Sequence, residues 1–256
     1  MKTFIINLEK DTERKQDIIS QCTAFDLDYA VIPAVDGREI NDDELKKILH
    51  PKKSKGMTRG EIGCSLSHYN IYKKIITENI EFALVLEDDA KLEKDLKQTI
   101  SSLKNHLPES PTIILLGPIN KYSTLDSKNI SDNYKLVNVL EAALSHGYLI
   151  NKSAAVKLLD FLYPIWLEAD RWVLMREYNI VGIKGIVPPV ITLSELSSTS
   201  TIWPTEKELQ KRKEIEKERS LTLKTIRRER SLYIKIKLFI WRNFTRKLIG
   251  VTSNDQ

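Results

Sequence analysis

The sequence has no long apolar run and very little cysteine. Its 256 residues include two cysteines, Cys22 and Cys64, and no metal-binding or redox spacing joins them. This usage is typical of reduced thiols in a cytosolic protein. No stretch approaches the ~18 apolar residues of a transmembrane helix, and the apolar run within residues 1–7 is too short for a signal peptide. We therefore expect a protein that is neither exported nor membrane-spanning.

Positive charge is scarce in most of the chain. Residues 1–205 contain 25 Lys and Arg against 28 Asp and Glu, a balance of −3, whereas residues 206–250 contain 15 against six, a balance of +9. An acidic body without a recognised binding motif argues against a nucleic-acid-binding protein. The basic segment predicts a helical tail whose partner is an anionic surface. We divide the chain into a catalytic domain of residues 1–205 and a tail of residues 206–256.

Short apolar strands alternate with helices as far as about residue 190. This alternation predicts an α/β fold with a mostly parallel central sheet. Thr58 and Glu61 form the S/T-x-x-E pattern of a capping box, which predicts a helix of about twenty residues. No GxGxxG follows the first strand, so a dinucleotide-binding domain is excluded. Residues 119–134 are polar and predict an irregular loop, too long for an ordinary connection.

Three carboxylates, Glu87, Asp88 and Asp89, follow the apolar strand Phe82–Leu86. The carboxyl ends of strands are where open α/β sheets bind ligands. Adjacent carboxylates repel one another, and a hard divalent cation relieves that repulsion. One alternative is that the acids cap a following helix. Another is a phospho-acceptor receiver domain, but the next strand ends at residues 115–118 without the acid that a receiver needs.

A metal-dependent sugar-nucleotide enzyme fits the cluster, because its cation neutralises the leaving diphosphate. Glycosyl transfer also needs a carboxylate within reach of the acceptor hydroxyl. Asp170 lies at the start of a predicted helix, where it is either that base or simply an N-cap. His68, on the helix that begins after Thr58, is either a ligand contact or a structural histidine.

Five blocks occur in order between residue 3 and about residue 190: Asn7-Leu8 with Arg14, Gly60-Glu61-Ile62-Gly63-Cys64-Ser65-Leu66-Ser67-His68, Leu86-Glu87-Asp88-Asp89-Ala90, Gly147-Tyr148-Leu149-Ile150 with Ala154-Ala155, and Ala169-Asp170. Together they resemble glycosyltransferase family 25, which includes bacterial lipooligosaccharide hexosyltransferases and has collagen galactosyltransferases as relatives. The most specific part is Gly-Cys-Ser-Leu-Ser-His followed by Glu-Asp-Asp. The tail lies outside the resemblance.

The resemblance implies a GT-A type nucleotide-sugar-binding fold. It also implies an inverting transfer of galactose or glucose from a UDP-sugar to lipooligosaccharide core. By the same resemblance, Glu87 and Asp89 hold Mn²⁺ or Mg²⁺, and Asp170 is the catalytic base. The expected donor-binding residues are Asn7, Arg14, Ser67, His68 and Asp88. The alternative is a non-catalytic, membrane-associated nucleotide-sugar-binding or assembly protein.

The tail has two parts. Residues 206–230 are densely charged and predict a solvated helix. A helix over residues 231–249 would have an apolar stripe formed by Tyr233, Ile236, Ile240, Phe244 and Leu248, with Trp241 beside it. Basic residues lie largely on the opposite side of this helix: Lys235, Arg242 and Arg246. This pattern is typical of a helix in a membrane interface. It predicts a cytoplasmic protein peripheral on the inner face of the bacterial inner membrane. The alternative is that this helix packs on the α/β body.

Overall fold

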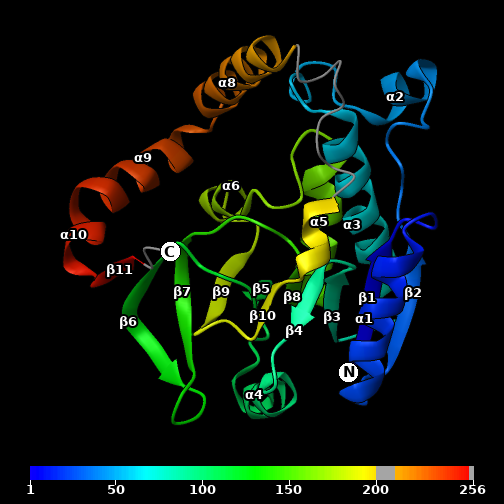
Figure 1. The fold of residues 1–256 in the computed structure, drawn as a ribbon. Helices are drawn as coiled ribbons and strands as arrows, with labels where there is room; N and C mark the ends of the chain where they lie inside the picture. Colours follow the sequence, from blue (N-terminus) through cyan, green and yellow to red (C-terminus); the bar gives the residue numbers. More distant parts are fainter. Residues whose placement is uncertain (200–210, 254–256) are drawn as a thin grey trace.

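A nine-stranded sheet runs through the molecule, here described from a computed structural model in which residues 1–199 and 211–253 are placed (Figure 1). The strand order is β11-β6-β7-β9-β5-β8-β3-β1-β2, and β10 and β4 form a separate pair. The strands are β1 (Lys2–Asn7), β2 (Tyr29–Pro33), β3 (Phe82–Glu87), β4 (Ala90–Leu92), β5 (Thr112–Leu115), β6 (Lys121–Asn129), β7 (Lys135–Glu141), β8 (Gly147–Asn151), β9 (Gly182–Val187), β10 (Ile191–Leu193) and β11 (Val251–Ser253).

Most strands of the large sheet run in one direction. The strands β2, β1, β3, β5, β9 and β6 share it, and β8, β7 and β11 run against them. The predicted α/β fold with a mostly parallel central sheet is therefore confirmed. Strand β1 lies between β2 and β3, so the chain passes from β1 to β2 on one side and then crosses over to β3 on the other. Such a reversal is the point at which α/β sheets bind ligands.

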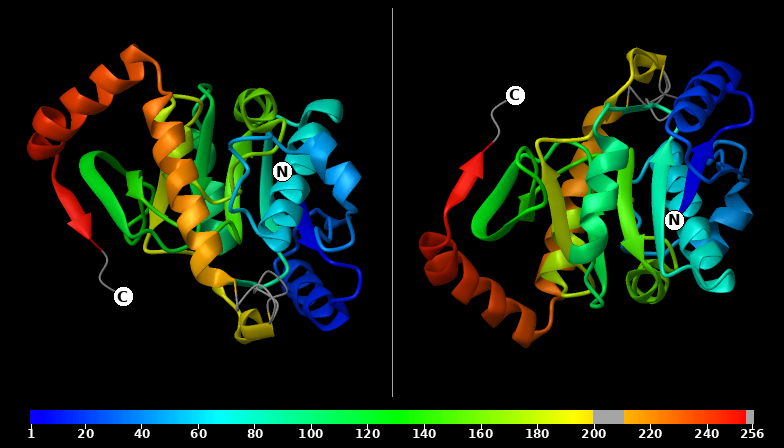
Figure 2. Two further views of the ribbon diagram at one scale, coloured as in Figure 1. Left: turned by 90° about the horizontal axis from the view of Figure 1, so that it is seen from above. Right: turned by 90° about the horizontal axis from the view of Figure 1, so that it is seen from below.

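Helices cover both faces of the sheet, because the strand side chains alternate between two apolar layers. Phe4 and Val85 point to one layer, whereas Ile5 and Leu86 point to the other. Helices α3 and α5 pack on the first layer, and α1 and α4 on the second (Figures 1 and 2). The helices are α1 (Thr12–Ala24), α2 (Asp42–Ile48), α3 (Arg59–Thr77), α4 (Leu96–Leu103), α5 (Lys152–Leu162), α6 (Trp172–Glu177), α8 (Arg212–Arg228), α9 (Leu232–Ile240) and α10 (Arg246–Leu248), with short 3₁₀ segments η1 (Lys104–His106) and η2 (Glu195–Thr199) and a π-helical segment η3 (Trp241–Thr245).

Several local predictions need correction. The loop expected over residues 119–134 contains β6, which is largely exposed and pairs with β7 and β11. An exposed strand carries no apolar period, which is why the pattern missed it. The acids after β3 do not cap a helix, because β4 follows them directly. The helix expected to start at Asp170 begins only at Trp172.

The described part of the tail divides into two packing environments. Helix α8 lies against the body, where Ile226 joins the core and the buried Arg219 pairs with Glu168. This segment was expected to be solvated, and Arg219 and Ile226 instead anchor it. Beyond it, α9 extends past the body (Figure 2, left) and leaves the predicted stripe exposed. The predicted boundary at residue 205 lies outside the described residues.

Candidate active site

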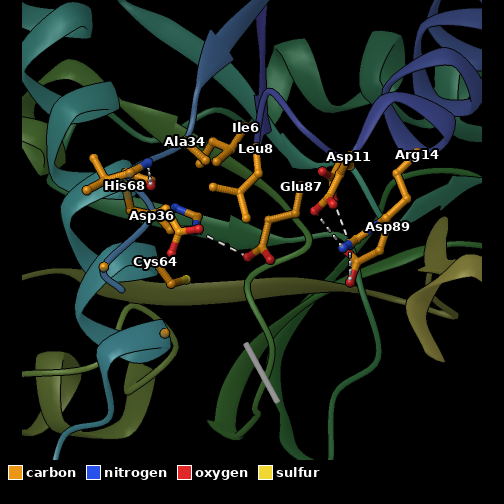
Figure 3. A pocket seen from close by; sticks show the side chains of 15 residues that line it. Ile6, Leu8, Asp11, Arg14, Ala34, Asp36, Cys64, His68, Glu87 and Asp89 are labelled. Carbon is orange, nitrogen blue, oxygen red and sulfur yellow. Dashed lines mark hydrogen bonds and ion pairs between the residues drawn. The ribbon is translucent and has the colours of Figure 1, made fainter. Parts of the chain in front are cut away.

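A pocket lies at the carboxyl ends of β1, β2 and β3, at the point where the strand order reverses (Figure 3). It has about 570 Å³ of open space. Residues after each of the three strands and from the first turns of α1 and α3 line it: Ile6, Leu8, Asp11, Arg14, Ala34, Val35, Asp36, Gly37, Gly60, Cys64, Ser67, His68, Glu87, Asp88 and Asp89. Four of the five predicted donor-binding residues and both predicted metal ligands are in this wall, so the structure brings these residues together around one pocket.

The loop after β2 forms one side of the pocket, and α3 holds it there. The backbone of residues 35–37 approaches α3 so closely that a Cβ on Gly63 would collide with the carbonyl oxygen of Val35. The Ser67 hydroxyl accepts a hydrogen bond from the Val35 amide at 2.9 Å and donates to the Gly63 carbonyl at 2.8 Å. The small residues of α3 therefore position this wall of the pocket. Gly63 permits the close approach of the loop backbone to the helix.

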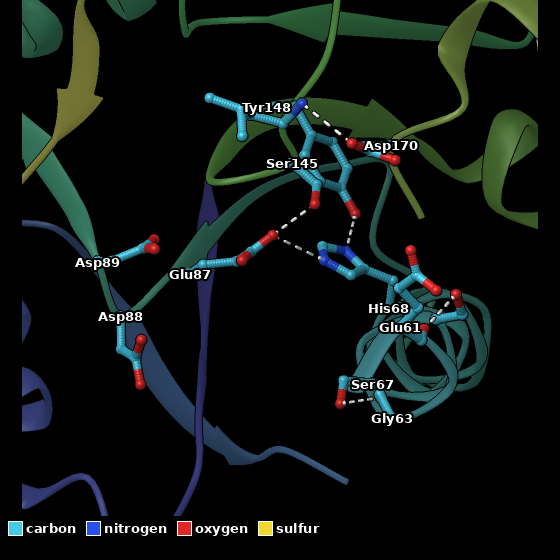
Figure 4. A network of polar contacts seen from close by, with 12 residues as sticks. Glu61, Gly63, Ser67, His68, Glu87, Asp88, Asp89, Ser145, Tyr148 and Asp170 are labelled. Carbon is cyan, nitrogen blue, oxygen red and sulfur yellow. Dashed lines mark hydrogen bonds and ion pairs between the residues drawn. The ribbon is translucent and has the colours of Figure 1, made fainter. Parts of the chain in front are cut away.

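Glu87 belongs to a buried polar network (Figure 4). Its Oε1 accepts from the Ser145 hydroxyl at 2.5 Å and lies 3.2 Å from His68 Nε2. His68 Nδ1 lies 2.7 Å from the Tyr148 hydroxyl. Burial by itself would raise the pKa of Glu87, but contacts with His68 and Ser145 outweigh it and the pKa is lowered. His68 thus has the structural partners of a satisfied histidine while it also lines the pocket.

Asp88 and Asp89 face Arg14 instead. Arg14 Nη2 lies 2.6 Å from Asp88 Oδ1 and 3.1 Å from Asp89 Oδ2. The Asn7 amide donates to Asp88 Oδ2 at 2.6 Å, so Asn7 contacts the site without being part of the pocket wall. Asp89 Oδ1 is buried and has no hydrogen-bond partner among the described residues. It is a carboxylate oxygen that can still accept a ligand.

The pocket holds more negative charge than its protein partners neutralise. Burial raises the pKa of Asp88 to about 6, although Arg14 and Asn7 oppose the shift. Burial and then Glu87 raise the pKa of Asp89 to about 7, again against Arg14. Asp11 and Asp36 add two more carboxylates to the wall. Arg14 is the one Lys or Arg among the described lining residues, and Lys10, outside the wall, pairs with Asp36. Carboxyl groups with raised pKa values that line a cleft are a feature of functional sites.

The residues present fit a divalent cation. The unpartnered Asp89 oxygen and the surplus of carboxylates are the hard donors that Mg²⁺ and Mn²⁺ take. The two predicted ligands, however, point to different partners: Glu87 to His68 and Asp89 to Arg14 (Figures 3 and 4). Donor atoms of Glu87, His68 and Cys64 lie within 4.8 Å of one another, and Asp89 is outside that group. One oxygen of Asp89 therefore has no partner among the described residues, while Glu87 is held by His68 and Ser145.

Asp170 lies just before α6 and does not cap it. Arg171 is the N-cap and makes no side-chain capping bond. The Asp170 carboxylate instead accepts from the Leu144 amide at 3.3 Å. Its charge, after burial and Glu87, contributes to raising the pKa of Cys64, a residue of the pocket wall. The N-cap alternative is thus wrong, and the half-buried carboxylate lies within electrostatic reach of the pocket.

Sequence reasoning missed several residues of the site. Asp11 and Asp36 line the pocket, and Ser145 holds Glu87. Asp36 could have been found, because it follows the predicted strand β2 and so lies at the same sheet edge as Glu87. Ser145 precedes β8, whose first residue, Gly147, pairs with Leu86 in the antiparallel register. That pairing could not be read from the sequence.

An α/β sheet with a carboxylate-rich pocket at its switch point fits the expected GT-A type nucleotide-sugar-binding fold. The sequence profile of glycosyltransferase family 25 (LPS biosynthesis protein) matches residues 1–173. The chain belongs to glycosyltransferase family 25, and the predicted resemblance is confirmed.

Several known proteins are similar to part of this chain. A glycosyltransferase 25 family member of Aedes aegypti is 34% identical over 167 residues, 61% of this chain and 27% of that protein. Procollagen galactosyltransferase 2 of Homo sapiens is 29% identical over 170 residues, again 61% and 27%. The chain thus matches about a quarter of the length of these relatives. A solved glycosyltransferase involved in glycosylation of the major capsid of PBCV-1 has 10% identity and a TM-score of 0.34, with 79% of this chain and 75% of that chain covered.

Proposed function

We propose that this protein is a metal-dependent, inverting hexosyltransferase that moves galactose or glucose from a UDP-sugar to lipooligosaccharide core. The observation that carries the proposal is the pocket at the ends of β1, β2 and β3, with Arg14 between two carboxylates and an unpartnered oxygen on Asp89. A nucleoside diphosphate brings further negative charge into that pocket. Its binding therefore requires a divalent cation, which Asp89 and, after release from His68, Glu87 would hold.

In this proposal the donor lies across the switch point of the sheet. Asp88, fixed by Asn7 and Arg14, faces the ribose, and Arg14 faces the uracil or a phosphate. A bound cation would neutralise the diphosphate as it leaves. The protein excludes water from one side with α3 and the loop after β2, which Ser67 secures.

Asp170 is the best candidate for the base that takes the proton of the attacking hydroxyl. Two other carboxylates close by, Glu61 and Glu168, are already engaged. Glu61 accepts from the Thr58 amide at 2.7 Å in the capping box, and Glu168 is buried in ion pairs with Arg171 and Arg219. Among residues 1–199 and 211–253, the Asp170 carboxylate accepts only the weak 3.3 Å bond from Leu144. A base must be able to exchange its hydrogen bonds with substrate, which favours Asp170.

The second half of the tail supports attachment to an anionic membrane, at the inner face of the bacterial inner membrane. Leu232 is 71% exposed and Leu248 84% exposed, and the whole predicted stripe between them is exposed. Leu238, away from the stripe, is buried, and Arg176 lies over the ring of Trp241 beside the stripe. Within the described residues no helix is long and apolar enough to cross a membrane. A helix lying in the interface fits this face, and nearby Lys and Arg contribute roughly 1 kcal/mol each on an anionic surface.

Calorimetry of UDP binding tests the donor proposal. We expect wild-type protein to bind UDP more tightly with Mn²⁺ than without, and Asp89→Ala to lose that gain. Asp43→Ala is the matched control, because Asp43 is an exposed acid that pairs with Lys46 on α2. Equal UDP affinity for wild type and Asp89→Ala in the presence of Mn²⁺ would contradict the proposed role of Asp89 as a metal ligand.

Sedimentation with vesicles of phosphatidylglycerol and phosphatidylethanolamine tests the membrane proposal. Wild-type protein is expected to sediment at low salt, and Phe244→Glu and Leu248→Glu to stay in the supernatant. Leu125→Glu is the control, since Leu125 is an exposed leucine on β6, outside the stripe. If all three variants sediment like wild type, the stripe does not bind the membrane.

A further inference from the structure

A second cavity is lined by Asp170, which is not part of the donor-pocket wall. It has about 910 Å³ of open space between α6, the end of β7 and the tail. Asp170 and Trp172 come from the body, whereas Leu223 and Arg227 of α8 and Arg242 of η3 come from the tail. The cavity therefore exists only because the tail packs on the body.

Asp170 connects this cavity with the donor pocket. Asp170 is part of the wall here, and its charge contributes to raising the pKa of Cys64 in the wall of the donor pocket. In Figure 4, Asp170 and Asp89 lie on opposite sides of the pair formed by Glu87 and His68. A base that serves glycosyl transfer must touch the acceptor hydroxyl while the donor lies beyond it. That requirement places the acceptor in the second cavity.

The charges in the cavity indicate what kind of acceptor fits. Glu141 pairs with Lys121 at 2.6 Å, and Glu177 pairs with Arg230 and Arg242. Arg171 is paired with Glu168. These contacts satisfy the acids of the wall other than Asp170.

Arg227 is different. It is exposed, and none of the ion pairs among residues 1–199 and 211–253 includes it. A guanidinium in this position is suited to a phosphate or carboxylate group, which it can bind with paired hydrogen bonds. Apolar groups of Ala142, Ala143 and Leu223 offer a surface to the carbon face of a sugar ring.

We propose that this cavity is the acceptor site and that it takes a saccharide carrying an anionic group, with Arg227 as the contact for that group. The inference rests on the proposed hexosyltransferase function and deepens it. The acceptor hydroxyl lies at Asp170, which takes its proton as the new glycosidic bond forms and the bond to UDP breaks. The exposed stripe of α9 and α10 follows Arg227 directly in the chain, so a lipid-borne saccharide would reach the cavity from the membrane side.

The test compares Arg227→Ala with Arg228→Ala. Arg228 is also exposed on α8 but is not part of the cavity wall. The probe acceptor is core oligosaccharide released from lipooligosaccharide by mild acid, in three forms: untreated, phosphatase-treated and carboxyl-reduced. We expect Arg227→Ala to raise the KM for untreated acceptor about tenfold or more, the worth of a charge-assisted contact. UDP affinity and hydrolysis of UDP-hexose should stay at wild-type values, and Arg228→Ala should behave as wild type.

The treated acceptors identify the anionic group. If the group is phosphate, the KM difference between wild type and Arg227→Ala disappears with phosphatase-treated acceptor. If it is carboxylate, the difference disappears with the carboxyl-reduced form. Equal acceptor KM for Arg227→Ala and Arg228→Ala overturns the acceptor site and leaves the hexosyltransferase standing, provided that wild type transfers hexose. Wild-type protein that neither hydrolyses nor transfers any UDP-hexose overturns the proposed function, and the acceptor site with it.

Discussion

The ion pair between Arg219 and Glu168 predicts that the tail is needed for the stability of the body. Arg219 projects from α8 and is 9% exposed, and Glu168, two residues before Asp170, is 7% exposed. Burial lowers the pKa of Arg219, and Glu61 opposes that shift. The perturbation is Arg219→Ala, which leaves Glu168 buried with Arg171 as its remaining partner.

The size of the effect follows from this burial. Removing one partner of a buried pair costs about 3–5 kcal/mol, because the other charge remains without compensation. Arg171 still reaches Glu168, so the lower end, about 3 kcal/mol, is expected. For a chain of this size that corresponds to a fall in Tm of roughly 6–12 °C. The double variant Glu168→Gln with Arg219→Met should recover much of the loss, since it removes both charges and keeps the volume.

Urea and thermal unfolding followed by circular dichroism measure these differences. The control is Arg212→Ala, also on α8, because its pair with Glu216 is 65% and 62% exposed. An exposed pair contributes about 0–1 kcal/mol. If Arg219→Ala loses no more stability than Arg212→Ala, then α8 is not an integral part of the body. The same reasoning predicts that a chain ending at residue 205 melts well below the full chain.

Three further predictions concern the site. Asp170→Asn should lower kcat by a factor of about 10² or more, the usual worth of a general base, and leave UDP-hexose affinity nearly unchanged; near-normal turnover would exclude Asp170 as base. In a Cys22→Ser background, Cys64 should react slowly with iodoacetamide at neutral pH and faster as the pH rises, because burial, Glu87 and Asp170 raise the pKa of its thiol. Adding Asp170→Asn removes one of those negative charges and should speed the reaction at a fixed pH, whereas an unchanged rate would contradict the closeness of Asp170 to the pocket. Ser145→Ala should raise the pKa of Glu87, because it removes a hydrogen bond to the charged form of this carboxylate. NMR titration of the Glu87 carboxyl carbon measures this pKa, and an unchanged pKa would contradict the prediction.

Local signals were sufficient for much of the fold. The capping box from Thr58 to Glu61 forms with both of its hydrogen bonds and starts α3 as predicted. The apolar run from Phe82 gives β3, and the acids that follow it line the pocket. Both depend on residues that are close in the sequence. Strand β6 was missed because its stability comes from pairing with β7 and β11 rather than from an apolar face.

The site was predicted as a set of residues but not as an arrangement. The direction of the Glu87 side chain depends on His68 and Ser145, which come from different elements. The burial of Arg219 depends on Glu168, 51 positions away. The charge of α8 suggested a solvated helix, since a charged residue is rarely buried unless it has a partner. An ion-pair partner that is distant in the sequence cannot be predicted from the local pattern of apolar and charged residues.

We propose that the pocket at the switch point of the sheet binds a UDP-hexose and releases UDP with the help of a divalent cation. The most direct measurement is UDP release from UDP-galactose, UDP-glucose and UDP-N-acetylglucosamine, with acceptor present, with and without Mn²⁺. We predict release from UDP-galactose or UDP-glucose that requires Mn²⁺ and is lost in Asp89→Ala. Absence of UDP release from all three donors with Mn²⁺ and lipooligosaccharide acceptor, by folded wild-type protein, would contradict the claim.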